Sequence, residues 1–379
     1  SFRNTPLFKE LLNQVGENGF IHVITTHPNR YKSFKTPPVD STENGIHYKI
    51  DRIIIPSHNS GFLDQINSFQ VYYREAFKIA KQSKYNLVYA SSSRLFTAFL
   101  GKKIASFHKI PVYLDIRDIF VDTIKDIFKR RKIMQIPVVI FLKIIEKYTF
   151  SNTNHINLVS EGFKNYFSKY PKPTYTFFTN GIDDIFIENI STNHPSNSKN
   201  KVILYTGNIG SGQGLEKIIP QAAIALGEQY TFRLIGDGGT KYLLLNKLKE
   251  LDVKNVELLS PVPRDQLILH YKQADFLFLH LNDLEAFRKV LPSKIFEYSV
   301  FNKPIIAGVS GYANQFIKEH LDNYIIFKPT DVDDFVQKLK VFSICNMNRS
   351  SFIENFSRKK ITREMAKSIL GLADDSIKF

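Results

Sequence analysis

Short apolar segments alternate with amphipathic helical segments along almost the whole chain. The short segments are rich in β-branched and aromatic residues, which favour strands. We predict strands at 20–25, 86–91, 110–116, 155–160, 175–180, 201–207, 230–238, 255–260, 274–281, 303–308 and 324–328. Because strands that alternate with helices form parallel sheets, this pattern predicts an α/β fold of the doubly wound type.

The predicted strands are too many for one sheet, and a length of 379 residues suits two domains. The polar segment "ENISTNHPSNSKN" at 188–200 is typical of a linker. We therefore predict one domain at 1–187, a second at 201–350 and a helical segment at 351–379 that returns to the first domain. Since ligands bind beyond the carboxyl ends of the strands in such sheets, two facing sheets would form a cleft.

The composition limits the classes of binding partner and the cellular compartment that we expect. The net charge of +15 indicates an anionic partner, which could be nucleic acid, lipid headgroups or phosphorylated metabolites. The single cysteine, Cys345, excludes a disulfide framework and fits a reducing compartment. The longest apolar run, 136–142, is much shorter than the roughly 20 residues of a membrane span. The histidines lack metal-ligand spacing and we expect no carboxylate motif of the Asp-x-Asp type, so we predict no metal and no cofactor.

The segment "YTGNIGSGQGLEKI" at 205–218 is a predicted strand followed by a glycine-rich turn and a helix. Its glycines, Gly207, Gly210, Gly212 and Gly214, let backbone N–H groups approach a phosphate, and the helix start adds positive charge. The Gly-Lys-Ser/Thr sequence of a P-loop is absent. The alternative interpretation is a flexible turn between strand and helix.

A second strand and glycine turn follow in "RLIGDGGTKYL" at 233–243. Gly236 and Asp237 lie in this turn and could contact the same ligand. An aspartate in such a turn can also cap the next helix or brace the loop.

The segment "KVLPSKIFEYSVFNKPIIAG" at 289–308 begins a helix with charged residues. Pro292 and Ser293 are typical of a helix start. Lys294 then lies at the positive end of the helix dipole, where a lysine is unfavourable unless an anion binds there. Glu297 lies one turn later on nearly the same face. We predict a diphosphate at Lys294 and a ribose at Glu297. The alternative is a Lys–Glu surface pair.

These motifs, in this order, resemble the donor-binding domain of the retaining glycosyltransferases of family four, which have the GT-B fold. The C-terminal motifs are "YTGNIGSGQGLEKI", "FRLIGDGG", "VELLSPVPRDQLILHYKQADFLF" and "PSKIFEYSVFNKPIIA", and "VYLDIRDIF", "LVSEGF" and "FTNGIDDIF" agree in the first half. The chain is most similar to bacterial transferases that build O-antigen or capsule repeat units on a lipid carrier. The family's first strand and its glycine loop have no counterpart here, so we expect a segment to precede Ser1.

The resemblance implies a set of donor-binding positions, with departures at three of them. The set is Gly207, Asn208, Gly210, Gln213, Gly214, Gly236, Asp237, Pro263, Ser293, Lys294 and Glu297. Of the family's Glu-x7-Glu pair, Glu297 matches the second member, but Lys289 replaces the first. The family's Arg and Lys on the glycine loop fall near Asn208 and Gln213, so Lys294 should contribute more of the diphosphate contact.

Two further catalytic candidates join Lys294 and Glu297. "DIRDIF" at 115–120 ends a strand of the first domain and directs Arg117 and Asp118 toward the predicted cleft. Many relatives have His-Asp at this corner, near the reacting sugar. Arg117 could hold phosphate charge and Asp118 could orient a hydroxyl, or the two could form an ion pair that braces the loop.

The segment 125–147 has seven basic and two acidic residues beside large apolar side chains. Its cluster Lys129, Arg130, Arg131 and Lys132, with the flanking apolar residues, could contact anionic lipid headgroups. Alternatively, 137–150 is an ordinary core helix and only 129–132 is a charged loop. We favour a mixture, in which the basic loop contacts the membrane and much of the helix is buried.

We therefore expect a metal-independent glycosyltransferase that lies on the inner face of the bacterial cytoplasmic membrane. The resemblance implies transfer of a sugar, an N-acetylhexosamine in our prediction, from a UDP-sugar to a polyprenyl-diphosphate-linked saccharide, with retention of configuration. Alternatives are a UDP-sugar epimerase of GT-B-like fold and a nucleic-acid-binding protein. The glycine loops and the lack of a basic-aromatic recognition module argue against the nucleic-acid binder.

Overall fold

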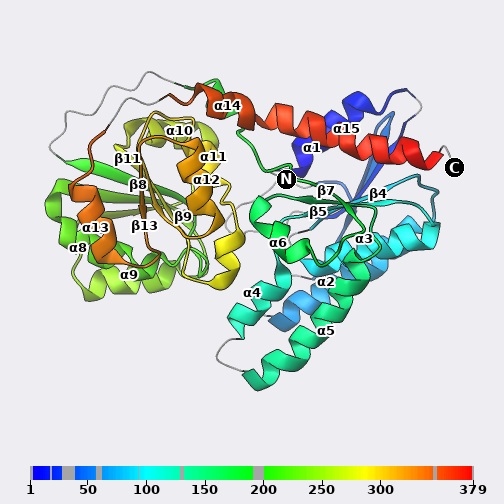
Figure 1. The fold of residues 1–379 in the computed structure, drawn as a ribbon, viewed down its shortest axis with the longest axis horizontal. Helices are drawn as coiled ribbons and strands as arrows, with labels where there is room; N and C mark the ends of the chain where they lie inside the picture. The colour runs from blue at the N-terminus through cyan, green and yellow to red at the C-terminus, as the bar shows by residue number, and fades with distance from the viewer. Residues whose placement is uncertain are drawn as a thin grey trace.

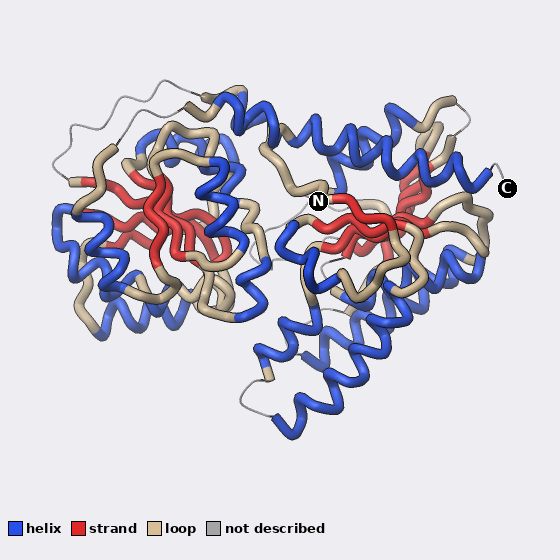
Figure 2. Tube along the Cα trace, in the orientation of Figure 1, coloured by secondary structure: helices blue, strands red, loops and turns tan. Residues whose placement is uncertain are grey.

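The computed structural model describes residues 3–17, 19–27, 39–56, 62–92, 94–128, 132–190, 200–344 and 348–377. The chain forms two lobes, each built around its own β-structure with helices outside (Figures 1 and 2). The lobes correspond to the first and second halves of the sequence, and a long C-terminal helix extends along the first (Figure 1). Most of the predicted linker 188–200 lies outside the described residues.

The first half contains two sheets. The smaller sheet has the order β1–β3–β2 and consists of β1 (Ile21–Thr26), β2 (Thr42–Asn44) and β3 (Tyr48–Ile53). The larger sheet is parallel throughout and contains, in spatial order, β4 (Val88–Ser92), β5 (Val112–Ile116), β6 (His155–Leu158) and β7 (Thr174–Thr176). The helices are α1 (Asn4–Gln14), α2 (Phe62–Ala80), α3 (Leu95–His108), α4 (Phe120–Ile127), α5 (Lys132–Phe150), α6 (Lys164–Phe167) and α7 (Asp184–Ile187), with the 3-10 helix η1 (Glu161–Phe163).

The second half has one parallel sheet with the order β10–β9–β8–β11–β12–β13 (Figure 1). Its strands are β8 (Lys201–Asn208), β9 (Tyr230–Asp237), β10 (Val256–Leu259), β11 (Phe276–His280), β12 (Ile305–Gly308) and β13 (Tyr324–Phe327). The helices are α8 (Ile219–Leu226), α9 (Lys241–Glu250), α10 (Arg264–Gln273), α11 (Lys294–Tyr298), α12 (Tyr312–His320) and α13 (Val332–Lys340), with the 3-10 helices η2 (Leu215–Lys217), η3 (Gly227–Gln229) and η4 (Glu285–Lys289).

Helices cover both faces of this second sheet. Ile203 of β8 belongs to a core with α8, α9 and α13, whereas the next residue, Leu204, belongs to a core with α10, α11 and α12. This alternation follows from the two-residue period of a strand. The sheet is therefore doubly wound, and each predicted strand has a counterpart within a few residues of its predicted bounds.

Two strands were not predicted from the sequence. β3 has the sequence "YKIDRI", in which charged residues alternate with apolar ones. Its Asp51 binds His22 of β1 and Thr42 of β2, so polar pairing as well as apolar burial holds this small sheet together.

The chain crosses between the halves a second time through α14 (Ser350–Phe356) and α15 (Arg358–Ile377). At this crossing Ile182 pairs with Ser357, and Arg358 Nη1 lies 2.6 Å from Asp183 Oδ2. α15 then packs on α1, where Leu7 and Leu11 share a buried cluster with Met365, Ala366 and Ile369.

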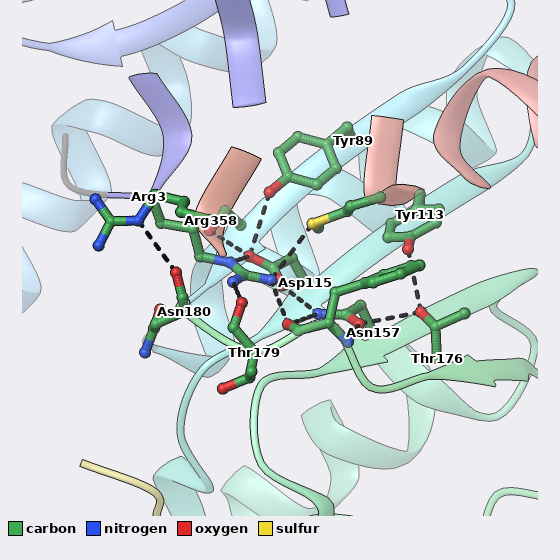
Figure 3. A network of polar contacts seen from close by, with 12 residues as sticks. Arg3, Tyr89, Tyr113, Asp115, Asn157, Thr176, Thr179, Asn180 and Arg358 are labelled. Atoms are coloured by element: carbon green, nitrogen blue, oxygen red, sulfur yellow. Dashed lines mark hydrogen bonds and ion pairs between the residues drawn. The ribbon is translucent and has the colours of Figure 1, made fainter. Parts of the chain in front are cut away.

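A buried ion pair lies near the carboxyl end of β5 in the first half, and Figure 3 shows the network around it. The Arg3 guanidinium donates to both carboxylate oxygens of Asp115 at 2.8 Å and to the carbonyl oxygens of Phe178 and Thr179 at 2.7 Å. Although burial alone would raise the pKa of Asp115, Arg3 and the hydrogen bond from Asn157 hold it below the usual value. This network fixes the end of β5 immediately before Arg117 and Asp118.

Candidate active site

The glycine turn joins β8 to η2 and packs directly on the end of β9. Gly207 and Gly214 have φ angles of 140° and 58°, which favour glycine. A Cβ atom at Gly236 would lie 1.9 Å from the Gly207 carbonyl oxygen. The two predicted glycine segments therefore meet, as parallel neighbouring strands allow.

The predicted polar residues of these two turns brace the backbone. Asn208 Nδ2 donates to Gln213 Oε1 at 2.8 Å, and Gln213 N donates to the Gly210 carbonyl at 3.0 Å. Asp237 accepts the N–H of Gly238 at its own Oδ1, and its carbonyl accepts the N–H of Ile209. The loop-bracing contact of Asp237 is thus present, and its contact with a ligand stays a prediction.

His280 and Asn282 also hold the glycine turn, and sequence reasoning missed both. His280, which is fully buried at the end of β11, accepts the Thr330 N–H at Nε2, so its Nδ1–H donates to the Gln213 carbonyl at 2.5 Å. Burial lowers the pKa of His280 to about 4, so the ring is neutral at pH 7. Asn282 bonds the carbonyls of Ser211 and Gly212. The available signal was polar side chains interrupting the apolar run "FLFLHLND".

Lys294 lies over the glycine turn. A Cβ atom at Gly207 would come within 3.5 Å of Lys294 Cε, and Lys294 Nζ lies 2.6 Å from Glu297 Oε2. Ser293 occupies the N-cap position of α11 but makes no side-chain capping bond. The Lys–Glu pair proposed as the alternative therefore exists, although it is not a surface pair, because Glu297 is only 7% exposed.

A chain of buried hydroxyl groups supports Glu297. The Tyr271 hydroxyl donates to Glu297 Oε2 at 3.1 Å and lies 2.8 Å from Thr206 Oγ1 on β8. Tyr271 belongs to α10, the helix that follows Pro263. These contacts link α11 to the strand that enters the glycine turn, so Lys294 and Glu297 are held in a fixed position.

Arg117 and Asp118 lie in the other half, between β5 and α4. Burial, and the nearby Asp122 to a smaller extent, raise the pKa of Asp118 to about 6 although the Ile119 N–H and the Thr123 hydroxyl act in the opposite direction. A carboxyl group with such a raised pKa is suited to proton transfer near neutral pH.

A polar cavity of about 660 Å³ lies at the ends of β11, β12 and β13, lined by Asp283, Arg288, Ser310 and residues 328–333. None of the predicted donor residues lines it. The glycine turn stays the predicted anion site, because backbone amides at a turn next to a lysine suit a phosphate.

The described residues contain no group of three or more His, Cys, Asp or Glu side chains able to hold a metal ion. The expectation of no metal had overlooked one Asp-x-Asp sequence, Asp331 and Asp333. It lies at the start of α13, where Asp331 caps the helix by accepting the Asp334 N–H. Metal independence stays a prediction.

Comparison with known proteins supports the resemblance drawn from the motifs. Residues 186–359 match the family model described as glycosyl transferases group 1. Over 95 residues, which are 25% of this chain, the sequence is 35% identical to WcaI of Escherichia coli (strain K12). WcaI is named, provisionally, as a glycosyl transferase of colanic acid biosynthesis. That match spans 23% of WcaI.

Two solved structures have the same fold over most of the chain. Anabaena Alr3699/HepE in complex with UDP and glucose has a TM-score of 0.55 and 14% identity, and the match covers 88% of this chain and 86% of that protein. WaaG, a glycosyltransferase involved in lipopolysaccharide biosynthesis, has a TM-score of 0.58 and 13% identity, with 99% and 94% coverage. The predicted fold class is confirmed: the chain has the GT-B fold, and the match to the group 1 glycosyl transferases lies almost entirely in its second half.

Proposed function

We propose that the protein transfers a sugar, an N-acetylhexosamine, from a UDP-sugar to a polyprenyl-diphosphate-linked saccharide in bacterial O-antigen or capsule synthesis. The observation that carries this proposal is the position of Lys294 over the glycine turn, at the start of a buried helix. A lysine, backbone amides and a helix start together form a site for a diphosphate. HepE, whose structure contains UDP and glucose, has the same fold.

The reaction would break the bond between the sugar C1 and the diphosphate oxygen through an oxocarbenium-like state. Lys294 and the glycine-turn amides would stabilise the negative charge that grows on the departing UDP. The acceptor hydroxyl forms the new bond to C1 on the face that the UDP leaves, because we propose retention, and its proton passes to the departing diphosphate. Asp118 and Arg117 would orient the acceptor from the other half.

Binding of UDP tests the donor site without an acceptor. We expect Lys294→Met to weaken UDP binding at least tenfold in calorimetry, since a charge-assisted hydrogen bond contributes about 1.5–3 kcal/mol. Lys201→Met is the matched control, because Lys201 lies at the opposite end of β8 and pairs with Asp275. Equal affinities for both variants would refute the site. Conversion of donor sugar without any acceptor would instead indicate an epimerase.

We also propose that α5 lies on the inner face of the cytoplasmic membrane. One stripe along this helix is exposed and apolar: Ile133, Ile136, Ile140, Phe141, Ile144 and Tyr148, with exposed fractions from 41% to 90%. Lys143 and Lys147 are exposed on the same helix. None of the described helices is long and apolar enough to cross a membrane. A helix with such a stripe and basic residues suits the headgroup region of an anionic bilayer.

Co-sedimentation with vesicles tests this surface. We expect the double variant Ile140→Glu and Ile144→Glu to lose binding to vesicles that contain phosphatidylglycerol. Ile224→Glu, which alters an exposed isoleucine on α8, should bind as the wild type does. Residues 129–131 of the basic cluster lie outside the described residues, and neutralising 129–132 should weaken binding most at low salt. Membrane contact would be refuted if the isoleucine double variant and the 129–132 variant both bound vesicles as the wild type does.

A further inference from the structure

The 3-10 helix η4 belongs to the second half but is bonded to the first. Lys289 Nζ lies 2.7 Å from Asp122 Oδ2 at the start of α4. The Ser160 hydroxyl donates to the Lys289 carbonyl at 2.6 Å, and the Ala286 N–H donates to Asp126 Oδ2 at 3.0 Å. Side-chain and backbone groups of η4 therefore both cross the boundary between the lobes.

The packing around Lys289 is close. A Cβ atom at Gly162 of η1 would lie 2.4 Å from the Lys289 carbonyl oxygen. The Lys289 ammonium also lies 5.5 Å from the centre of the Tyr166 ring, whose hydroxyl donates to the buried Glu146. A carboxylate and an aromatic face thus hold the ammonium from the first half.

Asp122 is suited to keep this contact at neutral pH. Its side chain is 8% exposed and also accepts from Lys125 Nζ at 2.8 Å. Burial alone would raise the pKa of Asp122, but the two lysines hold it below the usual value. The Asp122 carboxylate is therefore ionised at neutral pH.

The position of Lys289 connects this contact to the donor site. Only residues 290–293 separate it from Lys294, and Asp118 lies four residues before Asp122. A lysine ammonium only donates hydrogen bonds. It therefore cannot accept hydrogen bonds from sugar hydroxyl groups, as a glutamate at this position would. Its partner in the structure is a residue of the opposite half.

We propose that Lys289 is a positioning residue: its bond to Asp122 ties η4 to α4 and so fixes Lys294 relative to Arg117 and Asp118. The bond between Lys289 and Asp122 joins the two lobes whether or not the protein transfers a sugar. Its effect on sugar transfer rests on the proposed function. Because the donor pocket lies within the second half, loss of the tie should affect the reaction, which needs both halves, more than UDP binding.

The test compares Lys289→Met with Lys169→Met. Lys169 Nζ pairs with Glu146 at 3.1 Å and lies 3.7 Å from the centre of the same Tyr166 ring and 5.1 Å from that of Tyr170, but all three partners belong to the first half. Hydrogen exchange of the Ala286 amide should be at least tenfold faster in Lys289→Met than in the wild type, and unchanged in Lys169→Met. Lys289→Arg should restore slow exchange.

Kinetics provide the second readout. We expect Lys289→Met to lower kcat at least tenfold while the Kd for UDP changes less than threefold, and Lys289→Arg to recover most of kcat. Ala286 exchange in Lys289→Met equal to that in Lys169→Met would overturn the tie. If the wild-type protein transfers no sugar, the proposed function fails, and the exchange measurement still decides whether Lys289 joins the lobes.

Discussion

The Lys294–Glu297 pair should respond unequally to the loss of each partner. The side chain of Glu297 is 7% exposed and that of Lys294 is 24% exposed. Lys294→Met leaves the buried carboxylate with the Tyr271 hydroxyl as its hydrogen-bond donor and Arg358 as the remaining nearby positive charge. Removing one partner of a buried ion pair costs about 3–5 kcal/mol. Glu297→Gln leaves an ammonium that water can reach and keeps an acceptor for Tyr271, so we expect a cost of about 1–2 kcal/mol.

Urea unfolding of the variants without ligand measures this difference. Lys294→Met should lower the free energy of unfolding by more than Glu297→Gln does, and the double variant should be more stable than Lys294→Met alone. Lys201→Met serves as the control, since its pair with Asp275 involves a lysine that is 37% exposed and should contribute about 0–1 kcal/mol. A Lys294→Met variant no less stable than Glu297→Gln would refute the assignment of Glu297 as the buried partner.

Three further predictions concern the glycine turn and pH. Gly236→Ala should lower the melting temperature and abolish UDP binding, because its Cβ would lie 1.9 Å from the Gly207 carbonyl and force β8 and β9 apart. His280 has a folded-state pKa of about 4, below its ordinary 6.5. Its contribution to stability is therefore present above pH 6.5 and falls by up to about 3 kcal/mol toward pH 4. Urea titrations of His280→Gln should show a smaller decline in stability over that range. Asp118 has a pKa of about 6 against an ordinary 3.8, so its contribution is present below pH 3.8 and is lost as pH rises through 6. The stability of Asp118→Asn relative to the wild type should therefore increase between pH 4 and 6.5, and a constant difference would contradict the raised pKa.

The sequence predicted the elements whose signal is local. The strand "FLFLH" is buried along its whole length and apolar up to His280, and Gly207 and Gly214 mark a turn that their φ angles require. Lys294 and Glu297 are three residues apart, so helical geometry alone brings them together.

The contacts that could not be predicted join residues far apart in the chain. His280 bonds a carbonyl 67 residues earlier, and a backbone acceptor leaves no trace in the composition. Lys289 pairs with Asp122, 167 residues away, across the boundary between the lobes. Nothing in the spacing of Lys289 and Glu297 could reveal that the lysine is bound by the opposite half.

The packing of α15 on α1 has a consequence for biosynthesis. Leu7 and Leu11 of α1 share a buried cluster with Met365, Ala366 and Ile369 of α15. Arg3, which pairs with Asp115, is also in contact with Met365. While a ribosome extends the chain, this part of the first lobe stays open to water until synthesis has passed residue 369, whereas the sheet of the second lobe is complete at residue 327. The nascent chain should therefore leave the apolar face of α1 exposed until α15 has been made, and would be a substrate for chaperones during that interval.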